Sequence, residues 1–478
     1  MPYEPVIGLE VHVQLKTKSK VFCGCATEFG KVPNTQTCPV CLGFPGALPV
    51  LNNRALMSAI RVALALNCTI SDLIKFDRKN YFYPDLPKNF QISQYDRPLS
   101  YGGRLDVNIS NPRKRIGIRR VHLEEDTGKL LHEEKDEISL IDFNRSGIPL
   151  LEIVSEPDIN SSEEAYRYLT MLKSILQYLE VSDCDMEKGS LRCDANISLR
   201  KMGEKTLGVK TEIKNMNSFK GVRTALEYEF ERQVKILESG ERIVQETRLW
   251  NPEGGVTQSM RSKEEAHDYR YFPEPDLVPY ILPQELIDME KKALPELPEA
   301  RKARFVTAYG LPEYDADVLT QDKDLADFFE ECTKYYENPK SISNWMMGDL
   351  LGYINANLLK LKDVKLSPQN LAGLLKEIDS GKISGKMAKD VLLEMFKTGK
   401  DARNIIEEKG LVQISDEAQL EIFADEAIAE NKKSVEDFLK GKENALMFLV
   451  GQVMKKTKGR ANPTVINEIL RRKLSKGV

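Results

Sequence analysis

Three segments in the first half of the chain alternate apolar and polar residues with a period of two. In residues 7–15, I-G-L-E-V-H-V-Q-L, Glu10 and His12 occupy alternate positions between apolar residues. Successive side chains of a β-strand point to opposite faces. The alternation therefore predicts a strand with one buried face and one polar face, and it places Glu10 beside His12. Residues 191–199 and 209–214 repeat the same pattern.

The other two predicted strands also carry charge on their polar faces. Asp194 lies on the second strand and Glu212 on the third. Strands of this kind are typical of an antiparallel sheet that packs one face on a core and leaves the other face open. Residues 54–66 and 161–180 are expected to form helices that cover the apolar face, and the second begins with a capping-box sequence, S-S-E-E.

The character of the chain changes twice along its 478 residues. Strand patterns with Gly and Pro punctuation extend to about residue 280, and helical patterns follow a Pro-containing connector near residue 295. A chain of this length favours two or three domains. We expect an α+β protein: an N-terminal antiparallel-sheet cradle domain with helices at residues 1–293, an all-α helical domain at 294–407 and a small all-α tail domain at 408–478.

Composition and charge narrow the class of protein. Hydrophobic residues make up 41% of the chain and charged residues 30%, which is typical of globular domains. No segment approaches the apolar length of a membrane span, and residues 1–10 show no basic segment followed by an apolar core. We therefore expect a cytoplasmic protein, or one of an organelle matrix, that does not bind a membrane. The net charge of −4 leaves nucleic-acid binding to be decided by charge distribution.

Four of the eight cysteines cluster near the start of the chain in a C-x-C…C-x-x-C pattern: Cys23, Cys25, Cys38 and Cys41. Two such pairs, each on a tight turn, can direct four thiolates at one ion, so the spacing predicts a structural zinc site. Two disulfides are the first alternative, which a reducing compartment disfavours. An iron–sulfur cluster is the second, and its usual spacings differ from these.

An acidic cluster lies in residues 121–129, V-H-L-E-E-D-T-G-K, where Glu124, Glu125 and Asp126 are consecutive. A further carboxylate, Glu152, stands in an otherwise apolar run. Carboxylate oxygens suit a hard cation such as Mg²⁺, which bridges substrate phosphates. The alternatives are a solvated acidic turn for the cluster and an edge-strand glutamate for Glu152.

Two segments combine features that favour nucleotides or nucleic acid. Residues 76–95 hold Lys, Arg, Asn and aromatic residues between prolines, which suits phosphate contacts and base stacking, with a packed surface loop as the alternative. Residues 453–478 contain eight Lys or Arg and one acid. That basic segment is the electrostatic pattern of a nucleic-acid contact, with a solvated basic helix as the alternative.

Several enzyme classes are not supported by any motif. The sequence has no G-x-x-x-x-G-K-[ST] loop, no G-x-S-x-G elbow and no dinucleotide-binding glycine fingerprint. The Ser- and Gly-rich signature of an amidase nucleophile is also missing. Any amide hydrolysis linked to this chain is therefore expected on another chain.

The chain resembles the B subunits of the aspartyl/glutamyl-tRNA(Asn/Gln) amidotransferases over essentially its whole length. The strings that carry the resemblance are V-I-G-L-E-V-H-V-Q-L, F-D-R-K-N-Y-F-Y-P-D-L-P-K, H-L-E-E-D-T-G-K, D-F-N-R-S-G-I-P-L-L-E-I-V-S-E-P-D, G-S-L-R-C-D-A-N-I-S-L-R, E-I-K-N-M-N-S-F, D-Y-R-Y-F-P-E-P-D and G-L-V-Q-I-S-D-E. The cysteines match a zinc-bearing variant of the family. Some members lack them, so zinc is not expected to take part in the reaction.

The resemblance implies an ATP- and Mg²⁺-dependent reaction on misacylated Glu-tRNA(Gln), Asp-tRNA(Asn) or both. The side-chain carboxylate of the attached amino acid is phosphorylated, and ammonia then displaces the phosphate. The resemblance further implies a partner amidase subunit that produces the ammonia from glutamine, a channel between the subunits and a small third subunit. It also implies the cradle, helical and tail domains, the tail binding tRNA.

The residue patterns agree with this reaction, because phosphoryl transfer needs a metal and cationic clamps rather than a protein nucleophile. The expected magnesium ligands are Glu10, His12 and Glu125, with Glu124 and Glu152 as further members of the catalytic set. Arg78 and Lys79 are expected to contact phosphates. Asp194 and Glu212 are expected to line the ammonia exit or to position the acyl group.

Two other functions fit parts of the sequence. A non-catalytic tRNA-binding adaptor would use the acidic cluster only for structure, and its complex would consume no ATP with misacylated tRNA. A self-sufficient amidase would need the nucleophile signature that the sequence lacks. ATP consumption separates the first alternative from the enzyme.

Overall fold

The computed structural model describes residues 3–108, 113–132, 138–260, 269–411, 417–457 and 460–475. The chain divides into two compact units, residues 1–298 and 299–478. Asp268 and residues 412–416, which belong to two of the motifs above, lie outside the described residues.

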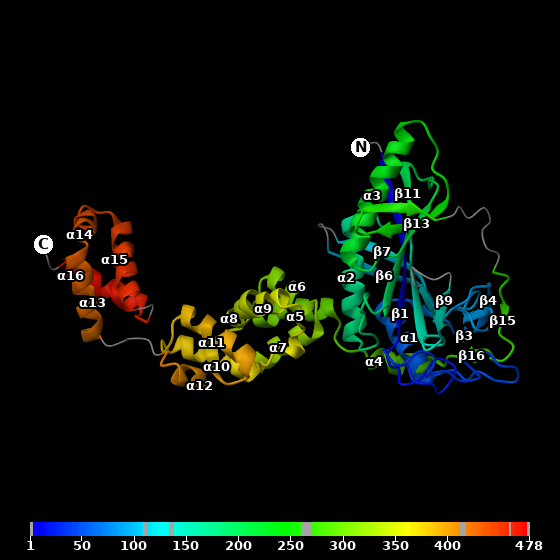
Figure 1. Cartoon of the computed structure of the whole chain (residues 1–478), viewed down its shortest axis with the longest axis horizontal. Helices are drawn as coiled ribbons and strands as arrows, with labels where there is room; N and C mark the ends of the chain where they lie inside the picture. The colour runs from blue at the N-terminus through cyan, green and yellow to red at the C-terminus, as the bar shows by residue number, and fades with distance from the viewer. Residues whose placement is uncertain are drawn as a thin grey trace. The chain divides into compact units, whose positions relative to one another are not determined.

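A nine-stranded sheet, counted over the described residues, forms the centre of the first unit (Figure 1). The strand order is β14-β13-β12-β11-β1-β10-β7-β6-β2, and all neighbours are antiparallel except β12 and β13. The bounds are β1 (Tyr3–Gln14), β2 (Thr69–Ile70), β6 (Ser100–Val107), β7 (Lys114–Glu125), β10 (Pro149–Ser155), β11 (Leu191–Lys201), β12 (Thr211–Lys214), β13 (Glu246–Asn251) and β14 (Val256–Ser259). The three strands predicted from alternation are thus β1, β11 and β12.

Helices cover the apolar face of this sheet, as the strand patterns require. They are α1 (Asn53–Ala65), α2 (Ser162–Tyr178) and α3 (Phe219–Glu238). The side chains of Leu9, Val11 and Val13 on β1 are completely buried in the same core as α1 and α2. Ser161 caps α2 by accepting a hydrogen bond from the Glu164 amide. The capping residue and the apolar stripe together explain why this helix forms here.

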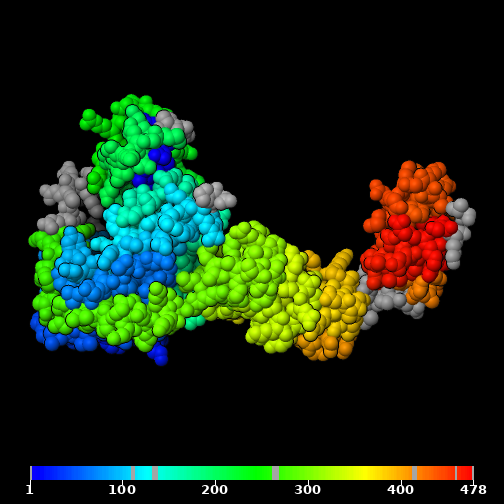
Figure 2. Space-filling view, turned by 180° about the vertical axis from the view of Figure 1, so that it is seen from behind, coloured from blue at the N-terminus to red at the C-terminus, as the bar shows by residue number. Residues whose placement is uncertain are grey.

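Short strands form beside the large sheet and connect distant parts of the sequence. They are β3 (Leu73–Ile74), β4 (Asp77–Asn80), β5 (Phe90–Ser93), β8 (Lys129–His132), β9 (Ser139–Asp142), β15 (Phe272–Pro273) and β16 (Tyr280–Ile281). The pairings β15 with β4 and β16 with β3 bring residues near 275 against residues near 75, so the green and blue segments adjoin in Figure 2. The basic and aromatic segment therefore forms a strand pair, β4 and β5, joined by a loop that contains its prolines, Pro84 and Pro87.

The first unit extends slightly beyond the strand-rich sequence. Helix α4 (Gln284–Lys292) packs on α1, where Arg61 forms an ion pair with Glu290. The compact unit ends at residue 298, five residues after the domain boundary expected at residue 293.

The second unit is helical and has two separate hydrophobic cores. The first core is built by α5 (Pro298–Tyr309), α6 (Glu313–Thr320), α7 (Lys323–Thr333), α8 (Pro339–Trp345), η1 (Met346–Leu350), α9 (Leu351–Ala356), η2 (Leu361–Asp363), α10 (Pro368–Asp379), α11 (Gly385–Thr398) and α12 (Ala402–Glu408). The second is built by α13 (Glu417–Glu430), α14 (Lys432–Leu439), α15 (Glu443–Lys456) and α16 (Pro463–Ser475). Within the described residues, no helix combines the length and apolar character needed to cross a bilayer.

The basic segment at the end of the chain is not a free arm. Its described part forms the end of α15 and all of α16. Arg472 pairs with Glu417 and Glu421, and Lys473 lies 2.8 Å from Asp425, so acids on α13 neutralise much of the basic face of α16. The local charge is consequently weaker than the segment alone suggested.

We expect the Leu169→Ala substitution in α2 to lower the free energy of unfolding of the sheet unit by about 2–5 kcal/mol, because Leu169 is fully buried and the truncation leaves a cavity. Urea denaturation followed by circular dichroism measures the change. The exposed Leu207→Ala is the control and should change it by less than about 0.5 kcal/mol. Equal effects of the two substitutions would contradict the packing of α2 on the sheet.

Candidate functional site

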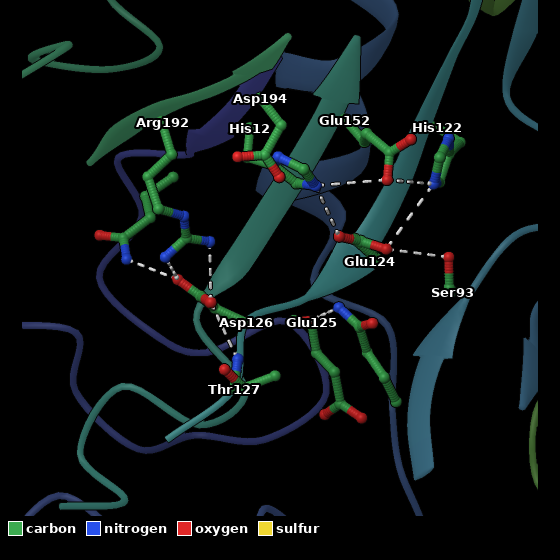
Figure 3. A network of polar contacts seen from close by, with 12 residues as sticks. His12, Ser93, His122, Glu124, Glu125, Asp126, Thr127, Glu152, Arg192 and Asp194 are labelled. Carbon is green, nitrogen blue, oxygen red and sulfur yellow. Dashed lines mark hydrogen bonds and ion pairs between the residues drawn. The ribbon is translucent and has the colours of Figure 1, made fainter. Parts of the chain in front are cut away.

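The polar face of the sheet brings three of the expected site residues together on three strands. His12 on β1 pairs in register with Glu152 on β10, and Glu124 comes from the neighbouring strand β7. His12 Nε2 lies 3.3 Å from Glu152 Oε2 and 3.9 Å from Glu124 Oε1 (Figure 3). The possible ligand atoms of the three residues lie within 4.8 Å of one another. Two carboxylates and an imidazole in this arrangement could hold a metal ion.

His122, which the sequence reasoning did not select, completes this group. It lies on β7 in register with Glu152, and its Nε2 is 3.5 Å from Glu152 Oε2 and 3.6 Å from Glu124 Oε2. The residue is 2% exposed, and its Nδ1 has no hydrogen-bond partner among the described residues. His122 and Glu124 are two positions apart, as Glu10 and His12 are. Alternation in V-H-L-E therefore already predicted that His122 and Glu124 lie on the same face of a strand.

The electrostatics of this group favour ionised carboxylates. Burial opposes ionisation of Glu152, but the charge of His122 and the hydrogen bond from His12 hold its pKa well below the usual range. Burial likewise opposes ionisation of Glu124, and His122 nevertheless lowers its pKa. Burial alone would lower the pKa of His12, yet the bond to Glu152 raises it overall. Ionised oxygens at close range are the donors that Mg²⁺ prefers.

Lys79 faces these carboxylates from β4. Burial works against its charge, but Glu124 is the strongest of the neighbours that raise the pKa of Lys79. Its Nζ lies 4.9 Å from the ring centre of Tyr269, and Tyr271 packs edge-on against Tyr269. Tyr271 in turn stacks on Tyr95 with 4.2 Å between ring centres. Lys79 is thus a cation that lies near the carboxylates of Glu124 and Glu152 and contacts the ring of Tyr269.

The side chain of Arg78 does not lie beside that of Lys79, and its expected contact with phosphate remains a prediction. Alternation along β4 turns Arg78 to the opposite side. There its guanidinium makes two hydrogen bonds to buried Glu274, at 2.7 and 2.9 Å, and lies 4.2 Å from the ring centre of Phe90. The guanidinium is thus held in a bidentate pair with a buried carboxylate.

Glu125 makes its own contacts outside the His12–Glu124–Glu152 group, and its expected role as a magnesium ligand remains a prediction. Its carboxylate accepts a hydrogen bond from the Ile92 amide at 2.9 Å and lies 2.7 Å from Lys88 Nζ. Since adjacent residues of β7 point to opposite faces, Glu124 and Glu125 cannot serve one ion together. Of the two acids, Glu124 is the one that lies beside His12 and Glu152.

Glu10, Asp194 and Glu212 form a second polar group on β1, β11 and β12. Glu10 pairs in register with Asp194, and Asn196 donates to Glu10 at 3.2 Å. Lys214 Nζ lies 2.7 Å from Asp194 and 3.2 Å from Glu212. Burial and then the charge of Glu152 raise the pKa of Glu10. Glu10 therefore lies near His12 and Glu152, but its side chain accepts its hydrogen bond from Asn196.

Asp126, the last of the three consecutive acids, pairs with Arg192. Arg192 donates to both of its oxygens, at 3.0 and 3.1 Å, and Gln14 donates at 2.7 Å. Arg192 lies on β11 in register with His12. The salt bridge consequently ties the turn after β7 to the strand on the far side of β1.

The four clustered cysteines converge as their spacing predicts. Cys23, Cys25, Cys38 and Cys41 place their sulfur atoms within 4.8 Å of one another. All eight cysteines of the chain belong to the described residues and are free thiols, so the structure has neither of the alternative disulfides. The Cys38 amide donates to Cys41 Sγ at 3.2 Å. Four sulfur donors at this separation could hold a metal ion such as zinc.

Buried Lys20 supports a charged form of this cysteine group. Its side chain is fully buried, with Nζ 3.6 Å from Cys41 Sγ and 3.3 Å from the Phe143 carbonyl. Among the described residues, no carboxylate forms an ion pair with Lys20. A buried ammonium needs a counter-charge. Thiolates bound to a metal supply one, whereas neutral thiols or disulfides do not.

Comparisons with known proteins agree with this architecture. Residues 5–288 match the family model described as GatB/GatE catalytic domain, and residues 327–474 match the model described as GatB domain. The chain is similar to the B subunit of the aspartyl/glutamyl-tRNA(Asn/Gln) amidotransferase of Caldanaerobacter subterraneus, with 59% identity over 100% of both chains. The namesake proteins of a Thermoanaerobacter species (58%, 100% of both chains) and of Brevibacillus brevis (55%, 99% of both chains) are also similar.

This chain belongs to the GatB family. The catalytic-domain model covers the nine-stranded sheet except for the first two residues of β1, and it includes both polar groups and the cysteine cluster. The family resemblance inferred from the motifs is thereby confirmed, as is the expected α+β fold.

We expect Lys20→Met to accelerate release of bound zinc to a chelator by about tenfold, because the neutral side chain leaves the thiolates without their buried counter-charge. Release is followed with a metallochromic dye on the zinc-loaded chain. Exposed Lys18→Met removes a nearby lysine without contact to sulfur and should leave the rate unchanged. Identical rates for the two variants would show that Lys20 does not act on the metal.

We expect Glu152→Gln to weaken binding of Mn²⁺, a spectroscopic substitute for Mg²⁺, by more than about tenfold, because one charged ligand of the His12–Glu124–Glu152 group is lost. Electron paramagnetic resonance titration gives the free Mn²⁺ concentration. Glu156→Gln, just beyond the end of β10, removes a more exposed carboxylate and serves as the control. Unchanged affinity in Glu152→Gln would exclude this group as the cation site.

Proposed function

We propose that this chain is the ATP- and Mg²⁺-dependent subunit of a tRNA-dependent amidotransferase. Its substrates are Glu-tRNA(Gln), Asp-tRNA(Asn) or both, and its products are Gln-tRNA(Gln) and Asn-tRNA(Asn). The family and the names of its relatives support the overall reaction. The assignment of the site rests on one observation: His12, Glu124 and Glu152 converge, and the positive charge of Lys79 lies near their carboxylates.

The proposed reaction has two steps. The side-chain carboxylate of the tRNA-bound amino acid attacks the γ-phosphorus of ATP, forming a C–O–P linkage as the bond to ADP breaks. Ammonia then attacks the acyl carbon, and inorganic phosphate leaves with the bonding electrons. Activation is needed because a carboxylate oxygen is a poor leaving group, whereas phosphate is a good one.

The residues on the polar face fit the first step. His12, Glu124 and Glu152 would hold Mg²⁺, which when bound offsets negative charge on the transferring phosphoryl group. Lys79 adds a positive charge next to the same carboxylates, where it can contact a phosphate oxygen. His122 contacts both Glu124 and Glu152, which would hold the two carboxylates in place before the substrate binds.

The second polar group fits the second step. The attacking ammonia becomes a cationic adduct and must lose a proton. Glu10 has a raised pKa through burial and the charge of Glu152, which suits a proton acceptor. Asp194 and Glu212, joined by Lys214, lie on the adjacent strands and would line the route by which ammonia arrives.

The proposal includes partners and a structural metal. Ammonia would come from glutamine on a separate amidase subunit, and a small third subunit would complete the complex. The word subunit in the relatives' names supports an assembly of several chains. Misacylated tRNA would contact the tail, and the four cysteines would hold zinc as a structural ion. Reduced thiols of this kind suit the cytoplasm.

We expect the assembled complex to form ADP from ATP with misacylated Glu-tRNA when glutamine and ammonia are omitted. A rapid-quench burst assay with labelled ATP measures this step, and correctly acylated Gln-tRNA should give no burst. Lys79→Met should lower the burst rate about a hundredfold through loss of one phosphate contact. Exposed Lys16→Met is the matched control. A tRNA-binding adaptor predicts no ADP in any of these reactions.

A further inference from the structure

Helix α13, in the tail of the chain, carries charge of one sign only. Its residues, Glu417–Glu430, include five acids and neither Lys nor Arg. Glu417, Glu421 and Asp425 follow one another at intervals of four residues, so they lie in a row on one side of the helix, about 6 Å apart along its axis. The helix therefore presents a line of carboxylates to the helices packed beside it.

Helix α16 lies beside α13 (Figure 1), and two of its cations pair with this row. Nη1 of Arg472 lies 2.6 Å from Glu417, and the same guanidinium also pairs with Glu421. Lys473 Nζ lies 2.8 Å from Asp425 and 3.7 Å from Glu421. The row of acids thus holds two cations of the basic segment at the end of the chain.

The remaining acids of α13 pair with α15. Glu426 and Glu430 lie 2.9 and 2.7 Å from Lys456 Nζ. All five carboxylates of α13 therefore have cationic partners on the two helices that carry the basic segment. Because five carboxylates face three cations, this part of the tail surface is negative while the pairs are closed, and it does not attract a polyanion.

These pairs can open without unfolding the tail. They lie at the surface, since the side chains of Asp425 and Arg472 are 61% and 44% exposed, and exposed ion pairs contribute little to stability. The position of α13 is instead fixed by Leu420, Ala424 and Ala427, which are buried in the core shared with α15 and α16. The cations could therefore exchange a carboxylate partner for a phosphate.

We infer that α13 is an internal competitor of tRNA, whose carboxylates occupy Arg472, Lys473 and Lys456 in place of phosphate groups. The inference rests on the proposed function, in which tRNA contacts the tail. Carboxylate and phosphate oxygens are alternative partners of Arg and Lys. A cation that already has an intramolecular partner adds little to phosphate binding and to the release of counterions. The pairing thus lowers the affinity of the tail for tRNA, and the salt dependence of binding, below what its basic residues alone would give.

Binding of uncharged tRNA(Gln) to the assembled complex, followed by fluorescence anisotropy over a series of KCl concentrations, tests the inference. The double variant Glu421→Gln, Asp425→Asn removes both partners of Lys473. It should lower Kd about fivefold and make the slope of log Kd against log [KCl] steeper by about one. The control is Glu436→Gln, Glu468→Gln, which removes two exposed acids of the tail that form no ion pair with a described residue. It should change Kd less than about twofold.

The Lys473→Met substitution in two backgrounds separates this competition from a general effect of charge. In the wild-type complex it should raise Kd less than about twofold, because Asp425 and Glu421 already occupy the lysine. In the double variant of α13 the same substitution should raise Kd about fivefold, because the released lysine then contacts phosphate.

Each outcome of these measurements has a distinct meaning. A gain in affinity that is confined to the α13 variant and depends on Lys473 supports the inference. Equal gains in the α13 variant and its control would assign the effect to net charge and overturn it. An equal effect of Lys473→Met in both backgrounds, or no change in any variant, also overturns it, because the lysine is then either already available or remote from tRNA. The ADP burst of the wild-type complex depends on none of these results, so failure of this inference is separable from failure of the proposed function.

Discussion

The antiparallel pairing of β1 with β10 on one side and β11 on the other is the constraint on which the rest of the site depends. It places His12 in register with Glu152 and with Arg192 at the same level of the sheet. Apolar residues at the intervening positions of β1 are fully buried beneath α1 and α2. A slip of one residue would expose them to water and turn His12 into the core. The energy of core packing thus fixes the position of the polar groups.

The same alternation explains which parts of the site the sequence could predict. Within one strand it placed Glu10 beside His12, and cysteine spacing placed the four sulfurs together. It did not establish which of Glu124 and Glu125 faces His12, because that depends on the face that β7 turns toward β10. The pairing of Arg78 with Glu274 could not be predicted, because the two residues are almost two hundred positions apart. The pairing of Arg472 with α13 could not be predicted either, because its partner is also distant in the sequence. Whether a charged side chain is available to bind a ligand depends on such long-range partners.

The three consecutive acids at the end of β7 have different partners, although they are neighbours in the sequence. Glu124 joins two histidines, Glu125 binds Lys88 and Asp126 binds Arg192. Each carboxylate is buried, and each has a different cationic partner, as the cost of burying an unpaired charge requires. Only Glu124 has histidines as its close partners, and imidazole is itself a metal ligand when neutral. The proposed cation site therefore rests on the kind of partner that each acid has, since all three acids are equally buried.

The cysteine loop obeys the same rule, because its buried cation also has close polar partners. Lys20 is buried against Cys41 and the Phe143 carbonyl, so the thiolates and the turn after β9 share one cation. That turn also contains Arg145, which donates to the carbonyls following Asp126. A continuous set of contacts thus leads from the four sulfurs to the turn that ends β7. The carboxylates of β7 and β10 do not depend on these contacts, because sheet pairing holds those two strands independently.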